Sequence, residues 1–257
     1  MKMSYPAMLN KVPELTIAFW IIKVLGTTVG ETAADYLSFN LHMGLTGTSL
    51  LMGALLLVSL FIQIKKDKYV PWIYWTTVVL ISIVGTLITD DLVDNFGVSL
   101  KVTTAVFSVA LILTFIAWQK SEKSLSVHTI FTTKRELFYW TTILFTFALG
   151  TAAGDLLSEG LNLGYTISAL LFSGVIGVMV LAHHLFKLNT ILTFWLAYIL
   201  TRPLGASCGD LLTQPVKYGG LGFNTSTISI LFLLIIIGLV VFLTVKQKNT
   251  LTATTTL

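Results

Sequence analysis

Three ionisable residues lie inside apolar stretches that are long enough to form membrane helices. Lys23 and Glu31 interrupt the first such stretch, and Arg202 interrupts the seventh. A charged side chain at the centre of a bilayer costs at least about 2.5 kcal/mol, so such residues face a partner or a water-filled path. We therefore expect all three to belong to an ion-binding or transport site. A purely structural buried ion pair is the alternative, although such pairs stabilise proteins poorly on balance.

Four aspartates recur at matching positions, each of them fifteen residues after a tryptophan: Asp35, Asp90, Asp155 and Asp210. Fifteen helical residues rise about 22 Å, so the four carboxylates lie at one level if the four tryptophans do. They could form an acidic vestibule or ion site at the external edge of the membrane. Each could instead cap the turn that follows, as the pattern D-x-x-[ST] at Asp155 and Asp210 suggests. Against capping, a carboxylate at the C-terminal end of a helix meets the unfavourable pole of the helix dipole.

Other kinds of chemistry have weaker support. The four histidines show no metal-ligand spacing, although His42 lies within reach of the acidic level and is a weak candidate ligand. The single cysteine, Cys208, leaves no disulfide framework to build. The chain has no nucleophile elbow, phosphate loop or zinc-protease pattern. We therefore expect neither an enzyme nor a bound cofactor, and the net charge of +4 does not indicate a nucleic-acid partner.

A repeat organises these residues. Trp20, Gly30 and Asp35 follow the spacing W-x9-G-x4-D, which returns without a slip at Trp75, Gly85, Asp90; at Trp140, Gly150, Asp155; and at Trp195, Gly205, Asp210. The intervals between tryptophans are 55, 65 and 55 residues. A repeat of this period indicates one supersecondary unit copied and packed on itself. The copies cover about 12–66, 67–121, 132–186 and 187–246 within a single membrane domain, residues 1–257.

Alignment of the copies shows that the charges have been added to a symmetric frame. Lys23, Thr27, Glu31 and Asp35 step by four along the first copy. The places matching the first three hold Val78, Ser82, Thr86 in the second copy, Ile143, Phe147, Thr151 in the third and Tyr198, Arg202, Ala206 in the fourth. Arg202 is thus level with Thr27 and one turn from Glu31. We expect these two to pair across the helices, because the guanidinium side chain is long enough to span the offset of about 6 Å.

The composition indicates an all-α membrane protein. Only 11% of residues are charged, against about 25% in soluble domains. Eight apolar runs each approach the roughly 20 residues that cross a bilayer: 14–37, 45–64, 70–94, 102–118, 137–158, 165–185, 189–212 and 226–245. Each copy holds two spans, so the four first helices run in the same direction, as a parallel repeat. We expect these odd-numbered helices to form the core and the even-numbered ones to face lipid.

Charge and aromatic residues predict how the helices lie in the membrane. Twelve of the sixteen lysines and arginines, from Lys2 to Lys248, fall on one side, while Lys101 and Lys217 fall on the other. Both termini are therefore expected in the cytoplasm, with 38–44, 95–101, 159–164 and 213–225 outside. Each repeat tryptophan follows another aromatic residue, which favours an interfacial aromatic belt. The repeat glycines favour close helix packing.

The chain resembles a family of bacterial membrane proteins defined by a repeat of unknown function. The resemblance covers about residues 12–246 through KVPELTIAFW, VGETAAD, YVPWIYW, LGTAAGD and LTRPLGASCGD. It implies a bacterial cytoplasmic-membrane protein with eight spans. It implies no activity.

The charges favour a transporter for a cation, coupled to protons or a metal, with its path between the odd-numbered helices. These helices contribute five acids, Glu31 and the four aspartates, against two bases, Lys23 and Arg202. The ionised site is net negative and attracts cations. The alternatives are an assembly or sensory protein without transport, and a membrane enzyme or electron-carrier protein that would need a nucleophile, a metal set or axial ligands.

Overall fold

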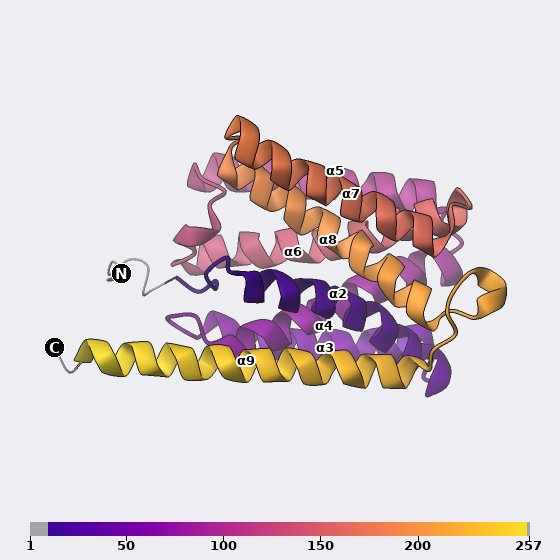
Figure 1. Ribbon diagram of the computed structural model, residues 1–257, viewed down its shortest axis with the longest axis horizontal. Helices are drawn as coiled ribbons and strands as arrows, with labels where there is room; N and C mark the ends of the chain where they lie inside the picture. Colours follow the sequence, from indigo (N-terminus) through magenta and orange to yellow (C-terminus); the bar gives the residue numbers. More distant parts are fainter. Residues whose placement is uncertain (1–9, 256–257) are drawn as a thin grey trace.

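The computed structural model describes residues 10–255, and the regular structure in this part of the chain is helical. Eight of its helices are long and apolar enough to cross a membrane, as predicted. They are α2 (Ile17–Asp35), α3 (Gly44–Ile64), α4 (Pro71–Asp90), α5 (Leu100–Glu122), α6 (Thr133–Asp155), α7 (Gly164–Phe186), α8 (Thr190–Thr213) and α9 (Thr225–Thr255) (Figure 1). Lys2 and the N-terminus lie outside the described residues, so their predicted side of the membrane stays a prediction.

Local sequence signals start the first helix of each copy. Thr16, Thr132 and Asn189 accept hydrogen bonds from the backbone N–H groups of Phe19, Arg135 and Ile191. Such side-chain caps satisfy donors that the first turn of a helix leaves unpaired. The helix α4 begins at Pro71 instead, where the missing N–H costs nothing. Each of the four inner helices therefore begins at a local start signal within the two turns before its repeat tryptophan.

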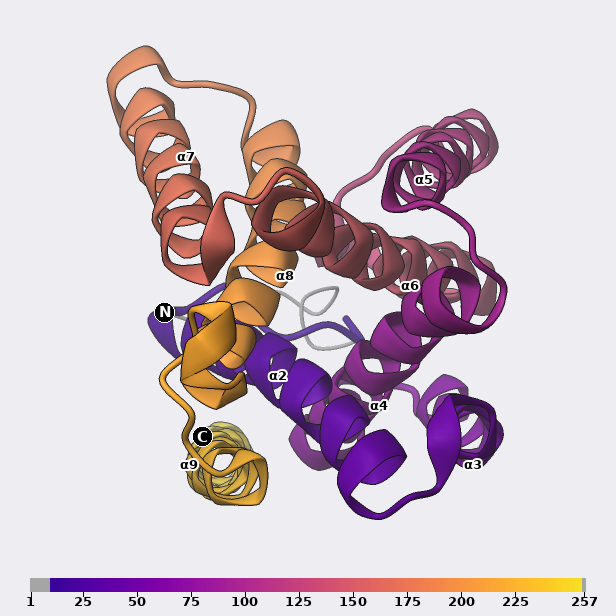
Figure 2. The same ribbon diagram turned by 90° about the vertical axis from the view of Figure 1, so that its right-hand side faces the viewer.

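The helices α2, α4, α6 and α8 form a closed ring. Each packs against the next, and α8 packs against α2 (Figure 2). The second helix of each copy packs on the first helix of the following copy, which pairs α3 with α4, α5 with α6, α7 with α8 and α9 with α2. The last helix thus closes the circle on the first copy. The helices α2, α4, α6 and α8 are spans one, three, five and seven of the chain. They form the core, as predicted, around an approximate fourfold axis.

The repeat glycines hold the ring together by close approach. A Cβ atom on Gly30 would lie 1.8 Å from Oγ of Ser82, and one on Gly205 would lie 1.7 Å from Oγ1 of Thr27. Gly85 meets Phe147 and Gly150 meets Arg202 in the same way. Each facing residue stands three positions before the glycine of its own copy, so one contact is repeated four times around the axis. Small residues permit this backbone approach between membrane helices.

The aromatic pairs also join neighbouring copies, and the predicted interfacial belt is wrong for most of them. Trp75, Trp140 and Trp195 are only 2%, 4% and 3% exposed. The aromatic residue before each tryptophan contacts the tryptophan of the next copy, with ring centroids 5.5 Å apart for Phe19–Trp75, 5.4 Å for Tyr74–Trp140, 6.2 Å for Tyr139–Trp195 and 5.9 Å for Phe194–Trp20. Adjacent residues on a helix point to different neighbours, so each pair bridges the ring on both sides.

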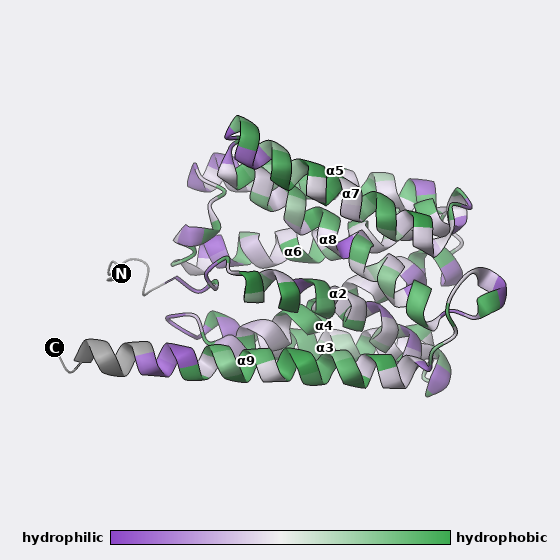
Figure 3. Cartoon of the chain, in the orientation of Figure 1, coloured by the Kyte–Doolittle hydropathy of each residue, from purple (hydrophilic) through white to green (hydrophobic). Residues whose placement is uncertain are grey.

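The outer helices expose apolar side chains to the surroundings. Leu57, Leu170, Val178 and Leu234 are among those that lie mostly outside the packed core. Figure 3 shows hydrophobic residues along most of α7 and α9, with hydrophilic residues gathered at the two ends of the bundle. This distribution is the one a bilayer requires. We call the end that holds Asp35, Asp90, Asp155 and Asp210 the acidic end, and the end that holds Lys65, Lys68, Lys120, Lys123 and Lys187 the basic end.

Three inner helices continue past the repeat aspartate in a five-residue π-helical turn. These turns are η1 (Tyr36–Asn40), η2 (Asp91–Asn95) and η4 (Leu156–Gly160), whereas α8 ends at Thr213 without one. The backbone bonds Leu41 to Tyr36, Phe96 to Asp91 and Leu161 to Leu156 recur at 3.0, 3.0 and 2.8 Å. The π-helix is rare and often lies at functional sites. Each turn contributes at least one residue to the lining of the cavity at the acidic end.

Candidate functional site

A cavity of about 170 Å³ opens on the axis at the acidic end, and we call it the acidic vestibule. It gathers five of the seven site residues that the sequence predicts, namely Glu31, Asp35, Asp90, Asp155 and Asp210. The side chains of Asp35, Asp90 and Asp155 make no cap hydrogen bond to the turns that follow them. The capping alternative is therefore wrong for these three, and they line a common cavity instead.

A second layer of the vestibule was not predicted. It is formed by Phe39, Asp94, Glu159 and Gln214, each four residues after a repeat aspartate. Asp94 and Glu159 raise the number of carboxylates in the cavity to seven. The spacing in the repeat could have revealed these residues, because each stands four residues after a repeat aspartate and so lies on the same face of its helix. Among residues 10–255, no three histidine, cysteine or acidic side chains gather closely enough to hold a metal ion, and His42 does not line the cavity.

Arg202 closes the floor of the vestibule and ties the four inner helices together. Its side chain is fully buried, and Nη2 donates to Oε2 of Glu31 at 2.9 Å. The predicted pair between Arg202 and Glu31 is therefore confirmed. Nη2 also donates to the hydroxyls of Thr86 and Thr151, the latter at 2.7 Å. Nη1 lies 3.5 Å from the carbonyl oxygen of Thr27 on α2.

These partners occupy one level of the repeat. Glu31, Thr86 and Thr151 each follow the repeat glycine of α2, α4 and α6, and the matching place on α8 is Ala206. A small residue at that place leaves room for the guanidinium to cross from one turn below. The ion pair therefore involves four side chains from four helices. Breaking it changes contacts between all four inner helices.

Lys23 lies deeper and is not part of the vestibule. Its Nζ atom stands 3.9 Å from the ring centroid of Phe147 and 4.2 Å from that of Tyr198. The amine has no hydrogen-bond partner among the described residues. A cation above aromatic faces is attracted by the ring quadrupole, more strongly when water is excluded. The guanidinium of Arg202 approaches the same Phe147 ring at 5.6 Å, so both buried bases contact one aromatic side chain.

A second buried ion pair lies at the basic end. Nζ of Lys11 is 2.7 Å from Oε2 of Glu136, and both side chains are almost fully buried. Glu136 also accepts hydrogen bonds from Gln63 and Trp140, and Lys11 donates to the carbonyl of Ile64. Lys11 lies at the end where the other basic residues gather, as the charge pattern predicts, but its pairing with Glu136 was not predicted. The signal was available, because the places that match Glu136 in the other copies are uncharged.

Towards the basic end the axis is filled by side chains. Phe147, Tyr198, Tyr74 and Tyr139 are fully buried, and the hydroxyls of Tyr74 and Tyr139 lie 2.5 Å apart. Lys23 fills the space between this aromatic layer and Arg202. The vestibule is therefore open at the acidic end and blocked beneath Glu31 in this conformation.

The repeat is also recognised by comparison with known families. The sequence model described as Repeat of Unknown Function (DUF347) matches the chain four times, at residues 18–69, 73–124, 138–189 and 193–249. No curated protein and no solved structure matches the chain.

Proposed function

The chain belongs to the family of the Repeat of Unknown Function (DUF347), and we propose that it carries a cation across the membrane, coupled to the release of Arg202 from Glu31. The observation that supports this most strongly is the convergence of seven carboxylates in one small cavity, one of which, Glu31, forms a buried ion pair with Arg202. The cavity lies where four equivalent helices meet. Sites near the centre of internal repeats are typical of transporters.

The charge of the vestibule favours a cation. Seven carboxylates cannot all ionise in about 170 Å³ unless protons or other cations balance them, because like charges at short range repel strongly in a medium of low dielectric. Anions are repelled by the same field. The vestibule therefore concentrates cations beside Glu31, whose own partner is a base.

The closed axis favours a carrier over an open pore. Arg202, Phe147, Tyr198 and Lys23 are fully buried beneath the vestibule. A fixed positive charge beneath an acidic mouth raises the energy barrier for a passing cation, whereas conduction through an open pore needs a shallow energy profile. A cation or proton that binds Glu31 competes with Arg202 for the carboxylate. A ligand shifts a conformational equilibrium only if it binds one conformation more tightly than the other, and this competition supplies that difference in affinity. Release of Arg202 also breaks its bonds to Thr86 and Thr151, so the change reaches the whole ring.

We propose further that the basic end faces the cytoplasm of a bacterial cell, with the chain in the cytoplasmic membrane. Exposed lysines gather at that end, including Lys68, Lys120, Lys123 and Lys187, and loops rich in lysine stay in the cytoplasm. The vestibule then opens to the outside. A cysteine in place of Tyr218, which is 61% exposed at the acidic end, should react with an impermeant thiol reagent in intact cells. Protection of that cysteine, with labelling only after lysis, would reverse the orientation.

Transport is tested in proteoliposomes with a panel of monovalent and divalent cations and a proton gradient. Neighbouring aspartates supply matched variants, because Asp90 lines the vestibule while Asp91 is bonded to Ser49 and Asn95, at 2.6 Å in each case. Asp90→Asn should raise the KM for the transported cation several-fold, and Asp91→Asn should leave it within about twofold. Equal effects of both changes would remove the vestibule from the path. Cation binding without flux of any panel member would instead favour a sensory or assembly protein.

A further inference from the structure

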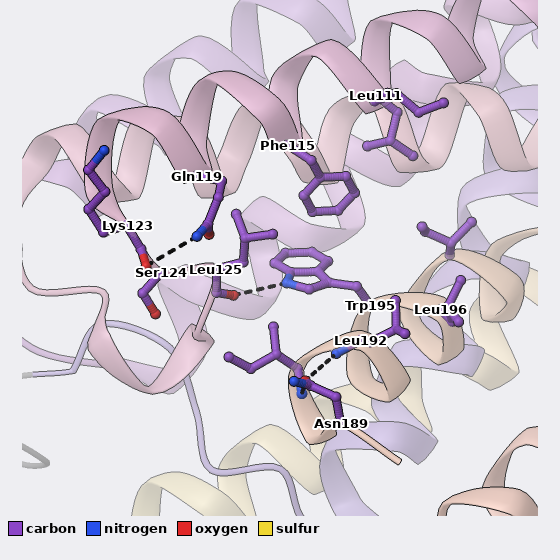
Figure 4. A pocket seen from close by; sticks show the side chains of 13 residues that line it. Leu111, Phe115, Gln119, Lys123, Ser124, Leu125, Asn189, Leu192, Trp195 and Leu196 are labelled. Carbon is purple, nitrogen blue, oxygen red and sulfur yellow. Dashed lines mark hydrogen bonds between the residues drawn. The ribbon is translucent and has the colours of Figure 1, made fainter.

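An open groove of about 680 Å³ lies between α5 and α8 near the basic end, on the outside of the ring (Figure 4). It is separate from the vestibule, which lies on the axis at the other end. Its walls are almost wholly apolar and come from two helices, with Leu111, Ile112 and Phe115 on one side and Leu192, Leu196 and Ile199 on the other. Polar residues appear only towards the basic end, where Gln119, Lys123, Ser124 and Asn189 form the rim.

The extra residues of the second copy build this rim. The interval from Trp75 to Trp140 is 65 residues, ten more than the other two intervals. The added length is shared by the end of α5, the start of α6 and the connection from Lys123 to Thr132 between them, which folds back under α8. There the carbonyl of Leu125 accepts the indole N–H of Trp195 at 3.0 Å, and the carbonyl of Ser124 accepts Nη2 of Arg135 at 3.0 Å. The rim is therefore a fixed part of the fold and not a loose loop.

The helices α5 and α8 leave the groove open between them. Of the four helix pairs that stand in this relation around the ring, α9 and α4 pack closely against each other, whereas α5 and α8 do not. Phe115 and Trp195 meet at its floor, with ring centroids 5.1 Å apart.

The dimensions of the groove match one leaflet of a bilayer. From Lys123 to Leu111 the helix α5 rises about 18 Å, and from Asn189 to Ile199 the helix α8 rises about 15 Å. Half of a hydrocarbon core of about 30 Å is about 15 Å. The apolar walls therefore lie at the depth of acyl chains, while Lys123 and Asn189 lie at the depth of headgroups.

The rim carries positive charge. Lys123 is exposed at the rim, and Lys120 and Lys187 are exposed close to rim residues in sequence; Lys123 and Lys187 end α5 and α7 in the left-handed conformation. The nearby acid Glu122 is engaged by Lys134 and Arg135, at 3.4 and 3.8 Å. Asn189 accepts the N–H groups of Ile191 and Leu192 with its oxygen, which leaves its Nδ2 group as the possible donor to a ligand.

We propose that the groove binds an anionic phospholipid from the leaflet at the basic end. The phosphate lies at Lys123 with Asn189 beside it, and one acyl chain lies between α5 and α8 against Phe115 and Leu196. Basic pockets between membrane helices hold anionic headgroups in this way, and each lysine near the surface contributes about 1 kcal/mol. The bound chain fills the space that α5 and α8 leave open between them.

Native mass spectrometry of the full-length protein in detergent, titrated with phosphatidylglycerol or phosphatidylcholine, tests this site. Wild-type protein should bind phosphatidylglycerol at least fivefold more tightly than phosphatidylcholine. Lys123→Asn, a change that the left-handed backbone tolerates, should weaken that binding about fivefold, which corresponds to one lysine. Lys68→Asn, at an exposed position of the same end outside the groove, should change it less than twofold.

Leu196→Trp fills the groove without touching the rim and should displace the lipid whichever headgroup it carries. Equal binding of the two lipids by wild-type protein would overturn the proposal, since any annular lipid behaves so. An equal loss in Lys123→Asn and Lys68→Asn, or full binding by Leu196→Trp, would overturn it as well.

Discussion

Replacing Arg202 with methionine should destabilise the ring more than replacing Arg202 and Glu31 together. The single change leaves the carboxylate of Glu31 buried, with the hydroxyl of Thr86 at 3.4 Å as a remaining contact. Removing one partner of a buried ion pair costs about 3–5 kcal/mol, because the other charge stays uncompensated. At roughly 2–4 °C for each kcal/mol in a chain of this size, the Tm should fall by about 6–20 °C.

The double change, Arg202→Met with Glu31→Met, leaves no charge behind. The hydroxyls of Thr86 and Thr151 still donate to the carbonyls of Ser82 and Phe147, at 3.2 and 3.3 Å, so neither donor becomes unsatisfied. Methionine adapts to irregular space, and swaps of similar volume cost less than about 1.5 kcal/mol. Thermal unfolding in one detergent, followed for wild type, both single variants and the double variant, gives the coupling energy. A double variant as unstable as Arg202→Met would refute the reasoning.

The other predictions concern the packing of the ring and the buried amine. Gly85→Ala should cost about 1–3 kcal/mol, because the new Cβ would lie 2.7 Å from Cβ of Phe147 and 3.1 Å from a backbone nitrogen of α6. Gly174→Ala on α7 meets open space and should be neutral or slightly stabilising in the same melt; equal losses would contradict the ring contact. Lys23→Met should raise stability by about 1–3 kcal/mol, because the amine is buried without a hydrogen-bond partner among the described residues. A loss as large as that of Arg202→Met would show that Lys23 has a structural partner.

The sequence predicted the parts of the site that follow from the repeat alone. Alignment of the four copies places equivalent residues at one level of a ring, whatever the details of packing. That alignment was enough to bring Glu31 and Arg202 together and to gather the four aspartates at one end. The alignment also marked the first helix of each copy, now α2, α4, α6 and α8, as the core, because these helices carry the polar residues that lipid excludes.

Other features depend on tertiary packing that the repeat does not encode by itself. An aromatic pair near a membrane surface fits a belt as well as a core, and only the cyclic contacts of Trp75, Trp140 and Trp195 decide between the two. The π-helical turns extend the helices past the aspartates, so Asp94 and Glu159 were assigned to the helix ends and loops. The pairing of Lys11 with Glu136 joins residues 125 positions apart, so alignment of the repeat can mark Glu136 as an added charge but cannot identify its partner.

Flux through Glu31→Gln protein tests the proposed transport most directly. Glutamine keeps the shape of the side chain and a hydrogen-bond acceptor for Arg202, so it should lower the Tm less than Arg202→Met, although the guanidinium loses its counter-charge. It cannot carry the negative charge for which the cation and Arg202 compete. Coupled flux into proteoliposomes should therefore be lost across about pH 6 to 8, while the matched change Asp91→Asn retains it. Full flux through Glu31→Gln over that range would contradict a mechanism in which this carboxylate exchanges Arg202 for the transported cation.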